Sequence, residues 1–271
     1  MTTVLKLGGS VVTRKNEPET VDDRALDAAA AAVAGALDDA SRRETDEDGA
    51  DTPVDGLVVV HGGGSFGHHH AAERGVSATE GTRDAGDVTA IHGAMGELNA
   101  AVVEALQARG VEALPVRPLS VASQDRDGDL ALPTGAVAAM LDEGFCPVLH
   151  GDVVVQAGAG ATIASGDDLV VALATGLGVD RVGLCSTVPG VLDADGTVVP
   201  RIDRFADVAD AVGESDATDV TGGMAGKVRA LLDLPVPAHV FGPDDLEAFL
   251  AGGAPGTLVA GGDGPGDEGS A

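Results

Sequence analysis

Short hydrophobic runs alternate along this chain with longer amphipathic segments, and glycines mark many of the boundaries. The run Val58-Val59-Val60 is β-branched and bounded by glycine, which is typical of a strand buried on both faces of a parallel sheet. Longer segments carry apolar residues at helical spacing. Strands that alternate with helices predict an α/β fold, an open sheet with helices on both faces.

The same periodicity sets the expected positions of the elements. Strands are predicted at residues 3–7, 58–60, 112–121, 147–152, 181–186, 238–241 and 256–259, with a hairpin starting at 153–156. Helices are predicted at 21–39, 134–142, 166–177 and 228–234, with one or two more within 81–109. Residues 41–55 are expected to form a solvated acidic loop. A single domain is predicted over 1–260, followed by a disordered tail at 261–271.

Glycine turns follow several of the predicted strands. Ligands in open α/β sheets bind at the carboxyl ends of the strands. The loops after Lys6, Val60, Leu149 and Ser186 are therefore expected to meet at one edge of the sheet, with the Gly222 loop closing over them.

Three successive glycines, Gly62, Gly63 and Gly64, follow the strand at 58–60. Glycine lets a backbone approach a ligand closely, and exposed N–H groups beside the start of a helix form a cradle for anions. Three histidines, at positions 68–70, stand at the rim of this cradle. A tight structural turn is the alternative interpretation of the glycines alone.

Lysine is nearly absent: Lys6, Lys15 and Lys227 are the only three, and the other basic residues are arginine. Each lysine lies near a glycine-rich turn, where a compact ammonium group suits a phosphate oxygen. Chance survival of surface lysines is the alternative.

The charge balance narrows the possible partners. With 44 Asp plus Glu against 16 Lys plus Arg, the formal net charge is −28, which disfavours nucleic acid and anionic membranes as partners. Acids spread along the whole chain are typical of adaptation to a high-salt cytoplasm, as in a halophilic archaeon. The chain shows neither a signal peptide nor an apolar run long enough to span a bilayer, so a cytosolic location is expected. Cys146 and Cys185 are expected to be core residues.

Two further features have both a structural and a functional interpretation. The segment 81–109 carries an apolar stripe, which is ordinarily core but would also suit the wall of a pocket for an apolar substrate group. The stripe consists of Val88, Ile91, Met95, Leu98 and Val102. At the start of the helix at 166–177, an N-cap explains one of Asp167 and Asp168 but does not require both.

Motifs along nearly the whole chain resemble the amino acid kinase superfamily. They are Lys6-Leu7-Gly8-Gly9-Ser10 with Lys15, His61 to His68 (HGGGSFGH), Gly151-Asp152, Ser165-Gly166-Asp167-Asp168, and Asp219 to Lys227 (DVTGGMAGK). The GGGSFGH run with the paired lysines is similar to the branch that phosphorylates isopentenyl phosphate. This resemblance implies an αβα sandwich, a homodimer, and transfer of the γ-phosphoryl group of ATP, with Mg²⁺, to isopentenyl phosphate. The product would be isopentenyl diphosphate, on an archaeal route to isoprenoid lipids.

The resemblance also implies roles for individual residues. Lys15 would neutralise charge on the transferred group, Asp167 would orient the catalytic lysines, and Gly63 and Gly64 would separate the two phosphate sites. The residues implied for nucleotide binding are Lys6, Gly8, Gly9, Ser10, Gly64, Thr187, Gly222 and Lys227. Those implied for the acceptor are Gly63, Gly67, His68 and Gly151.

The chain departs from the family pattern in two places. Residues 186–190 read STVPG where relatives often have an acidic TDVDG turn, which leaves the adenine and ribose contacts open. Three histidines stand where one is expected, and His69 and His70 are interpreted as surface residues, with adventitious metal binding as the alternative.

Rival functions share many of these loops. They are a kinase for a small phosphonate antibiotic, an acetylglutamate or uridylate kinase, and a nucleotide-binding storage or regulatory protein without transfer activity. Retention of both Lys6 and Lys15 argues against the last, because ATP binding alone needs no charge between donor and acceptor.

The net charge predicts that stability depends on salt. Between 0.01 M and 1 M salt the Debye length shortens from about 30 Å to about 3 Å, so repulsion among the acids should be relieved. The melting temperature, measured by calorimetry in increasing KCl, should rise over this range. A melting temperature that stays constant would contradict the interpretation as a halophilic protein.

Overall fold

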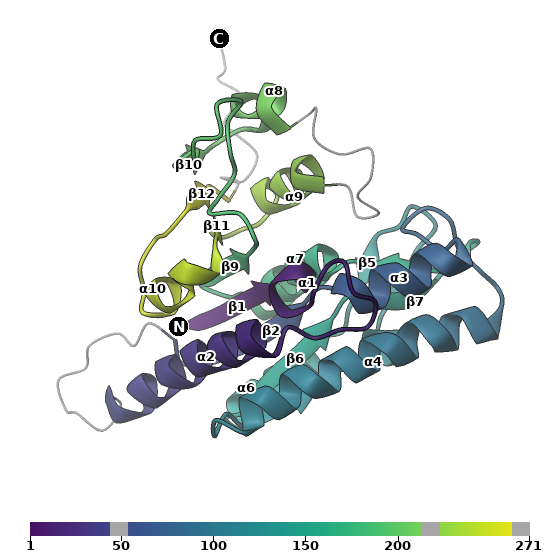
Figure 1. The fold of residues 1–271 in the computed structure, drawn as a ribbon, viewed down its shortest axis with the longest axis horizontal. Helices are drawn as coiled ribbons and strands as arrows, with labels where there is room; N and C mark the ends of the chain where they lie inside the picture. Colours follow the sequence, from purple (N-terminus) through teal and green to yellow (C-terminus); the bar gives the residue numbers. More distant parts are fainter. Residues whose placement is uncertain (44–53, 213–222, 262–271) are drawn as a thin grey trace, which may run out of the picture.

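The computed structural model describes residues 1–43, 54–212 and 223–261. The strands of its main sheet are β1 Thr2–Leu7, β2 Gly56–His61, β3 Ala113–Pro115, β6 Cys146–His150, β9 Arg181–Cys185, β10 Arg201–Ile202, β11 Ala238–Phe241 and β12 Thr257–Val259. Their order is β10-β12-β11-β9-β1-β2-β6-β3 (Figure 1). All neighbours are parallel except β11 and β12. The predicted α/β fold with a mostly parallel open sheet is confirmed.

Each helix predicted from the sequence has a counterpart in the structure, and the one at 166–177 matches at both ends, but the structure also contains helices that were not predicted. The α-helices are α1 Gly9–Val12, α2 Asp23–Arg43, α3 Gly64–Arg74, α4 Ala85–Gln107, α5 Pro118–Val121, α6 Gly135–Asp142, α7 Gly166–Leu177, α8 Ala209–Val212, α9 Gly223–Leu232 and α10 Leu246–Leu250. Two short 3₁₀ helices, η1 Phe205–Asp207 and η2 Pro243–Asp245, complete the set. The segment 81–109 contains one continuous helix, α4, rather than two.

The two faces of the sheet pack against different helices. Leu5 of β1 and Val59 of β2 belong to a core cluster that includes side chains of α2, α4 and α10. Val4 and Val58, which alternate with them, belong to a second cluster with side chains of α6, α7 and α9. Successive residues of a strand point to opposite faces, so a strand between two helical layers must be apolar throughout. This explains the continuous valine run and gives the αβα sandwich.

A small second sheet stands beside the main one. Its strands are β4 Ser123–Gln124, β5 Leu130–Ala131, β7 Asp152–Gln156 and β8 Gly160–Ala164, in the order β5-β4-β7-β8. The hairpin predicted to start at 153–156 is the antiparallel pair β7 and β8. The sequence did not predict β4 and β5, because two-residue strands carry no measurable periodicity.

Two predicted elements are wrong in part. The strand expected at 112–121 ends at Pro115, and Pro118 then begins the short helix α5, a position that proline favours. The helix expected at 228–234 already begins at Gly223, so Lys227 lies on α9 and not on a loop. The glycines at 223 and 226 indicated a loop, but packing of α9 against α7 overrides that local signal.

Several expectations concern residues outside the described ranges. The tail from 262 onwards, most of the predicted acidic loop at 41–55, and Gly222 are among them. Within the described ranges, no helix has the length and apolarity needed to cross a membrane. Cys146 and Cys185 are buried, as predicted, and burial raises the pKa of each thiol to about 12.

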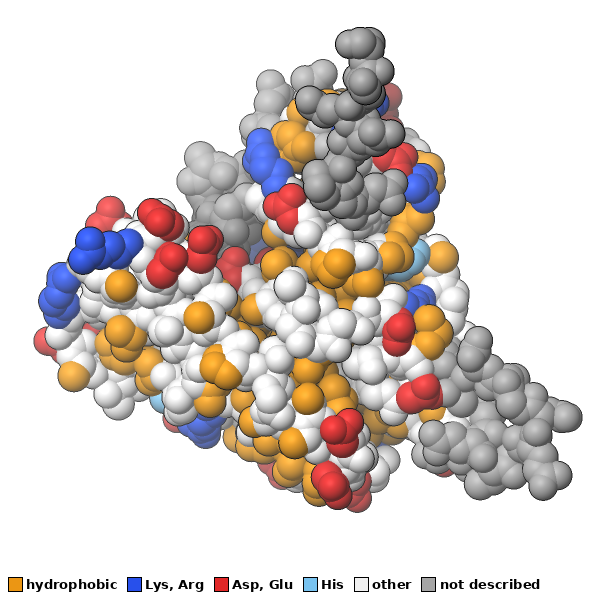
Figure 2. Space-filling view, turned by 180° about the vertical axis from the view of Figure 1, so that it is seen from behind, with side chains coloured by type: hydrophobic (Ala, Val, Ile, Leu, Met, Phe, Trp, Pro, Cys, Tyr) orange, Lys and Arg blue, Asp and Glu red, His pale blue; other side chains and the backbone are white. Residues whose placement is uncertain are grey.

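Acidic side chains are spread over the surface. Figure 2 shows them at several separate places on one face, with a few basic side chains among them. This distribution matches the absence of a single acidic tail in the sequence.

Candidate active site

A cavity of about 410 Å³ opens where β1, β2, β6 and β9 end. The loops after Lys6, Val60, Leu149 and Ser186 all contribute to its walls, so the predicted convergence at one edge is confirmed. The predicted site residues that line it are Lys6, Gly8, Gly9, Ser10, Lys15, Gly63, Gly64, Gly67, His68, Gly151, Asp167, Thr187 and Lys227. Only Gly222 is missing from this set, because it lies outside the described residues.

All three lysines of the chain line this single cavity. They come from distant parts of the sequence: Lys6 from β1, Lys15 from the segment after α1, and Lys227 from α9. In a chain of net charge −28, such convergence is not expected from chance survival of surface lysines. The cavity is a cationic site within an acidic protein.

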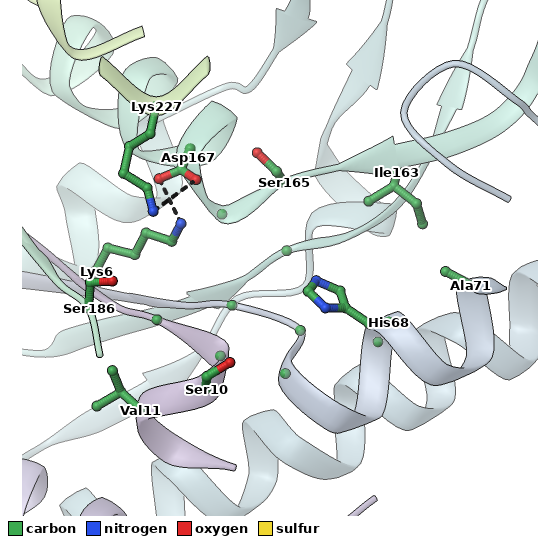
Figure 3. Close-up of a pocket in the computed structure, with 18 of the residues that line it drawn as sticks. Lys6, Ser10, Val11, His68, Ala71, Ile163, Ser165, Asp167, Ser186 and Lys227 are labelled. Atoms are coloured by element: carbon green, nitrogen blue, oxygen red, sulfur yellow. Dashed lines mark ion pairs between the residues drawn. The ribbon is translucent and has the colours of Figure 1, made fainter. Parts of the chain in front are cut away.

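Two of the lysines meet at Asp167, in the first turn of α7 (Figure 3). Lys6 Nζ lies 2.6 Å from Asp167 Oδ1, and Lys227 Nζ lies 4.0 Å from Oδ2. Burial would raise the pKa of Asp167, but the charges of Lys6 and Lys227 outweigh it and hold that pKa below its ordinary value. Burial lowers the pKa of Lys6, and Asp167 counteracts this effect.

The neighbouring Asp168 has a different task. Ser165 Oγ accepts a hydrogen bond from Asp168 N at 3.2 Å, and Asp168 Oδ2 accepts one from Ser165 N at 2.7 Å. This reciprocal capping box satisfies the start of α7 without Asp167. Asp167 is not needed for the cap, so its carboxylate is available to the lysines.

The glycine loops after β1 and β2 interlock backbone to backbone. A Cβ on Gly9 would overlap the backbone nitrogen of Gly64, and one on Gly62 would lie 2.6 Å from Gly9 N. Gly64 also has φ +49°, in the left-handed region that favours glycine. The two glycine motifs therefore depend on each other, and both line the same cavity.

His68, on α3, points into the cavity from the side opposite the lysine pair (Figure 3). Lys15 is exposed at the cavity edge and makes no ion pair with any described residue. Beyond His68 lie the apolar side chains Ala71 and Ile163. The cavity thus has a cationic end and an apolar end.

The apolar stripe on α4 is divided between two roles. Ile91 and Met95 line the cavity, whereas Leu98 and Val102 pack in the core with α2. Val88 is only partly buried. Two of the five stripe residues therefore lie where they could contact a bound substrate.

His69 and His70 are not among the described residues that line the cavity. His69 Nε2 lies 3.5 Å from Glu73 Oε1, and His70 Nε2 lies 2.6 Å from Glu19 Oε1. Arg74 Nη1 donates to His70 Nδ1 at 3.0 Å, so Nε2 is the ring nitrogen that donates to Glu19. That these two histidines have no role in the reaction stays a prediction.

A buried polar cluster behind the glycine loops was not predicted from the sequence. His61 and His150 end the neighbouring strands β2 and β6, and Asp152 Oδ2 lies 2.7 Å from His92 Nδ1. Burial lowers the pKa of His150, although Asp152 opposes that shift. The available signal was two strands that both end in histidine followed by glycine.

The side chains at the cavity fit a nucleotide's phosphates. Lysine ammonium groups and glycine N–H groups are donors for phosphate oxygens. In the described part of the chain, no three His, Cys, Asp or Glu side chains are grouped as metal ligands.

Comparison with known proteins gives consistent matches. The model of the amino acid kinase family matches residues 1–236. An isopentenyl phosphate kinase from Haloferax volcanii is 65% identical over 258 residues, which cover 95% of this chain and 98% of that protein. One from Methanocaldococcus jannaschii is 32% identical over 235 residues, covering 84% and 85% of the two chains. An X-ray structure of an isopentenyl phosphate kinase has a TM-score of 0.77 at 26% identity, covering 96% of this chain and 100% of that chain.

Replacing Asp167 or Asp168 by asparagine should lower the free energy of unfolding by different amounts. Asp167→Asn leaves Lys6 buried without its carboxylate and should lower the free energy of unfolding by about 3 kcal/mol. Asp168→Asn disturbs only the cap and should cost about 1 kcal/mol. Denaturant unfolding at constant high salt measures both values, and equal losses would contradict the separate tasks.

The contribution of Asp167 to the stability of the folded protein should also depend on pH. Its folded-state pKa is held below the ordinary 3.8, so its stabilising effect is present above that value and is lost as pH falls through the folded pKa. The difference in stability between wild type and Asp167→Asn should therefore narrow below pH 3.8. Unfolding curves for the two proteins across this range provide the measurement.

Proposed function

The chain belongs to the amino acid kinase family, and on that premise we propose that it transfers the γ-phosphoryl group of ATP to isopentenyl phosphate. The observation that carries the proposal is the convergence of all three lysines on one cavity, whose other end holds His68 and apolar side chains. Transfer between two anions requires positioning and neutralisation of charge, with little covalent chemistry by the protein.

The donor phosphates would lie at the cationic end. We assign Lys6, Lys227 and the N–H groups of Gly9 and Ser10 to these phosphates. Gly8 would be a close backbone contact, because its own N–H donates to Cys185 O at 2.8 Å. Asp167 would hold the two ammonium groups in position through its two carboxylate oxygens. Thr187 and Gly64 are further nucleotide contacts in this proposal, and Gly222 is a proposed contact outside the described residues.

Lys15 is the proposed catalytic cation. Its exposed position at the cavity edge leaves it able to approach the group in transfer. Charge spreads over the equatorial oxygens of that group in the transition state, where a mobile ammonium is most effective.

The acceptor phosphate would lie between the glycine loop and His68. Gly63, Gly67 and Gly151 line the cavity, and their small size leaves room for a bound anion. Among the described residues the Gly63 N–H has no protein acceptor, whereas Gly67 N donates to Gly63 O at 2.8 Å and Gly151 N donates to His61 O at 3.1 Å. His68 would donate a charge-assisted hydrogen bond to the acceptor phosphate.

The apolar end of the cavity supports an isoprenoid acceptor. Ala71, Ile91, Met95 and Ile163 line the cavity and would bury a short branched hydrocarbon. A small phosphonate or an amino acid derivative would leave these side chains without an apolar partner. The Haloferax volcanii relative carries the name of the same activity.

Three further parts of the proposal rest on the family resemblance. Mg²⁺ would bind together with ATP and would supply positive charge that stabilises the phosphates during transfer. A homodimer is proposed as the assembly, with light scattering as its test. The N-terminal part of the chain would bind the acceptor and the C-terminal part would bind the nucleotide, with the loop after β1 reaching the nucleotide phosphates from the N-terminal part.

An acceptor panel tests the proposed function. The purified protein is incubated with ATP and Mg²⁺ in molar KCl, together with isopentenyl phosphate, a small phosphonate, acetylglutamate or uridylate, and ADP release is measured. Release that depends on isopentenyl phosphate is expected. ADP release without acceptor preference, or no release with any acceptor, would contradict the proposal in favour of its rivals.

Lys15 and Lys6 should differ in kinetic effect. Lys15→Ala should lower kcat by about a hundredfold with little change in ATP affinity, because it acts on charge that develops during transfer. Lys6→Ala should weaken both kcat and ATP binding. Arg14→Ala, which removes an exposed neighbouring charge, is the control and should stay near wild type. Small and equal effects at both lysines would indicate that neither takes part.

His68 should contribute chiefly to the acceptor. A charge-assisted hydrogen bond of about 1.5–3 kcal/mol corresponds to a loss of about ten- to a hundredfold in kcat/KM for isopentenyl phosphate in His68→Ala, with ATP binding intact. His68→Gln keeps an N–H donor and should fall between. His69→Ala is the matched control, and a loss there equal to that of His68→Ala would show that the acceptor site is misplaced.

A further inference from the structure

Two buried histidines stand directly behind the glycine loops. His61 and His150 are register partners at the ends of β2 and β6, and both side chains are 0% exposed. Their rings stack with centroids 5.6 Å apart. Each ring contacts the next residue's carbonyl: His61 Nδ1 lies 3.1 Å from Gly62 O, and His150 Nδ1 lies 3.0 Å from Gly151 O. None of the steps proposed above uses them.

The hydrogen bonds of His61 have a fixed direction. A carbonyl oxygen only accepts, so His61 Nδ1 carries the proton and donates to Gly62 O. Asn99 Nδ2, on α4, lies 3.2 Å from His61 Nε2 and 3.4 Å from Val148 O, which is again only an acceptor. The amide nitrogen therefore donates to both. Burial, followed by the nearby His150, lowers the pKa of His61 to about 3, so the ring stays neutral in this tautomer near neutral pH.

This contact determines where the next N–H points. The peptide bond between Gly62 and Gly63 is trans, so its C=O and N–H groups point in opposite directions. Gly62 O is held by the buried ring, so the Gly63 N–H faces the other way, and Gly62 and Gly63 both line the cavity. Within the described residues, the Gly63 N–H donates to no protein acceptor. A peptide between two glycines has no side chain to oppose rotation, so its orientation depends on such a contact.

We propose that Asn99 and His61 are positioning residues that hold the Gly62–Gly63 peptide with the Gly63 N–H directed into the cavity, ready to donate to phosphate. Because Asn99 also donates to Val148 O on β6, the orientation is set against the neighbouring strand. A donor fixed before the ligand arrives needs no reorganisation during the reaction. The inference rests on the proposed function, which assigns the Gly63 N–H to phosphate.

A histidine that merely fills the core would affect stability but not ligand binding. His239 provides the matched control for that role. It lies on β11 of the same sheet, is 7% exposed, and its Nδ1 lies 3.3 Å from Pro255 O. It is not among the residues that line the cavity.

Pyrophosphate binding distinguishes a positioning role of His61 and Asn99 from a role in core packing alone. Calorimetric titrations in molar KCl compare wild type with His61→Phe, Asn99→Leu and His239→Phe, each first shown to be folded by a cooperative melt. The dissociation constant for pyrophosphate should rise about tenfold in the first two variants and stay within about twofold in His239→Phe. If His61→Phe does not fold, Asn99→Leu alone decides. An unchanged dissociation constant in folded His61→Phe or Asn99→Leu overturns the proposal, as does an equal rise in His239→Phe.

The tautomer of His61 supplies an independent test without any substrate. Nitrogen-15 NMR of the histidine-labelled wild-type protein should show His61 neutral with its proton on Nδ1 between about pH 5 and pH 8. Asn99→Leu removes the donor to Nε2 and leaves only Gly62 O to favour a proton on Nδ1, so a fraction of His61 protonated on Nε2 should appear. A proton on Nε2 in the wild type overturns the inference even if transfer to isopentenyl phosphate is normal. A correct tautomer in a protein that fails to transfer would instead count against the proposed function.

Discussion

The contact between Lys6 and Asp167 is the interaction on which the candidate site depends. Lys6 is 7% exposed on a central strand, where an ammonium group without a carboxylate would cost several kcal/mol. Asp167 supplies that carboxylate from the first turn of α7, where the helix dipole also favours a negative charge. A buried ion pair adds little net stability compared with apolar side chains of similar size. What the pair provides is a positive charge held at a fixed place beside the cavity, to which Lys227 is added from α9.

Close backbone packing is the second constraint, and it explains why two glycine motifs occur together. The loops after β1 and β2 approach so closely that a side chain at Gly9 or Gly62 would overlap the opposite loop. The ion pair and the glycine contact both begin at the end of β1, so a single strand positions the cations and the N–H donors. Gly166 belongs to the same arrangement, because a Cβ there would lie 3.1 Å from Lys6 Cε.

The charge distribution of the whole chain affects how the cationic cavity can bind anions. The surface is strongly acidic, and the three lysines are reserved for the one cavity that should bind anions. A surface of net charge −28 repels anionic ligands at low salt, and the cations must act against that field. At high salt the Debye length shortens, so the distant acids are screened while contacts within the cavity persist. The similarity to a Haloferax volcanii protein supports this view of the chain as a halophilic one.

Sequence alone determined the features that are encoded within a few neighbouring residues. Valine runs, helical spacing and glycine turns predicted the parallel sheet, the meeting of its loops at one edge, and α7 to its last residue at Leu177. Motif order and the scarcity of lysine identified thirteen residues that line one cavity. The start of α9 was misplaced because the local glycine signal opposed a helix that packing against α7 stabilises.

Only the tertiary structure could assign separate tasks to Asp167 and Asp168, because adjacent aspartates look alike until Lys6 and Ser165 are placed around them. The contact of Asn99 with His61 joins residues 38 positions apart, and no local pattern specifies such a pair. It arises only when α4 packs on β2, since side-chain contacts between distant segments are set by how the layers come together.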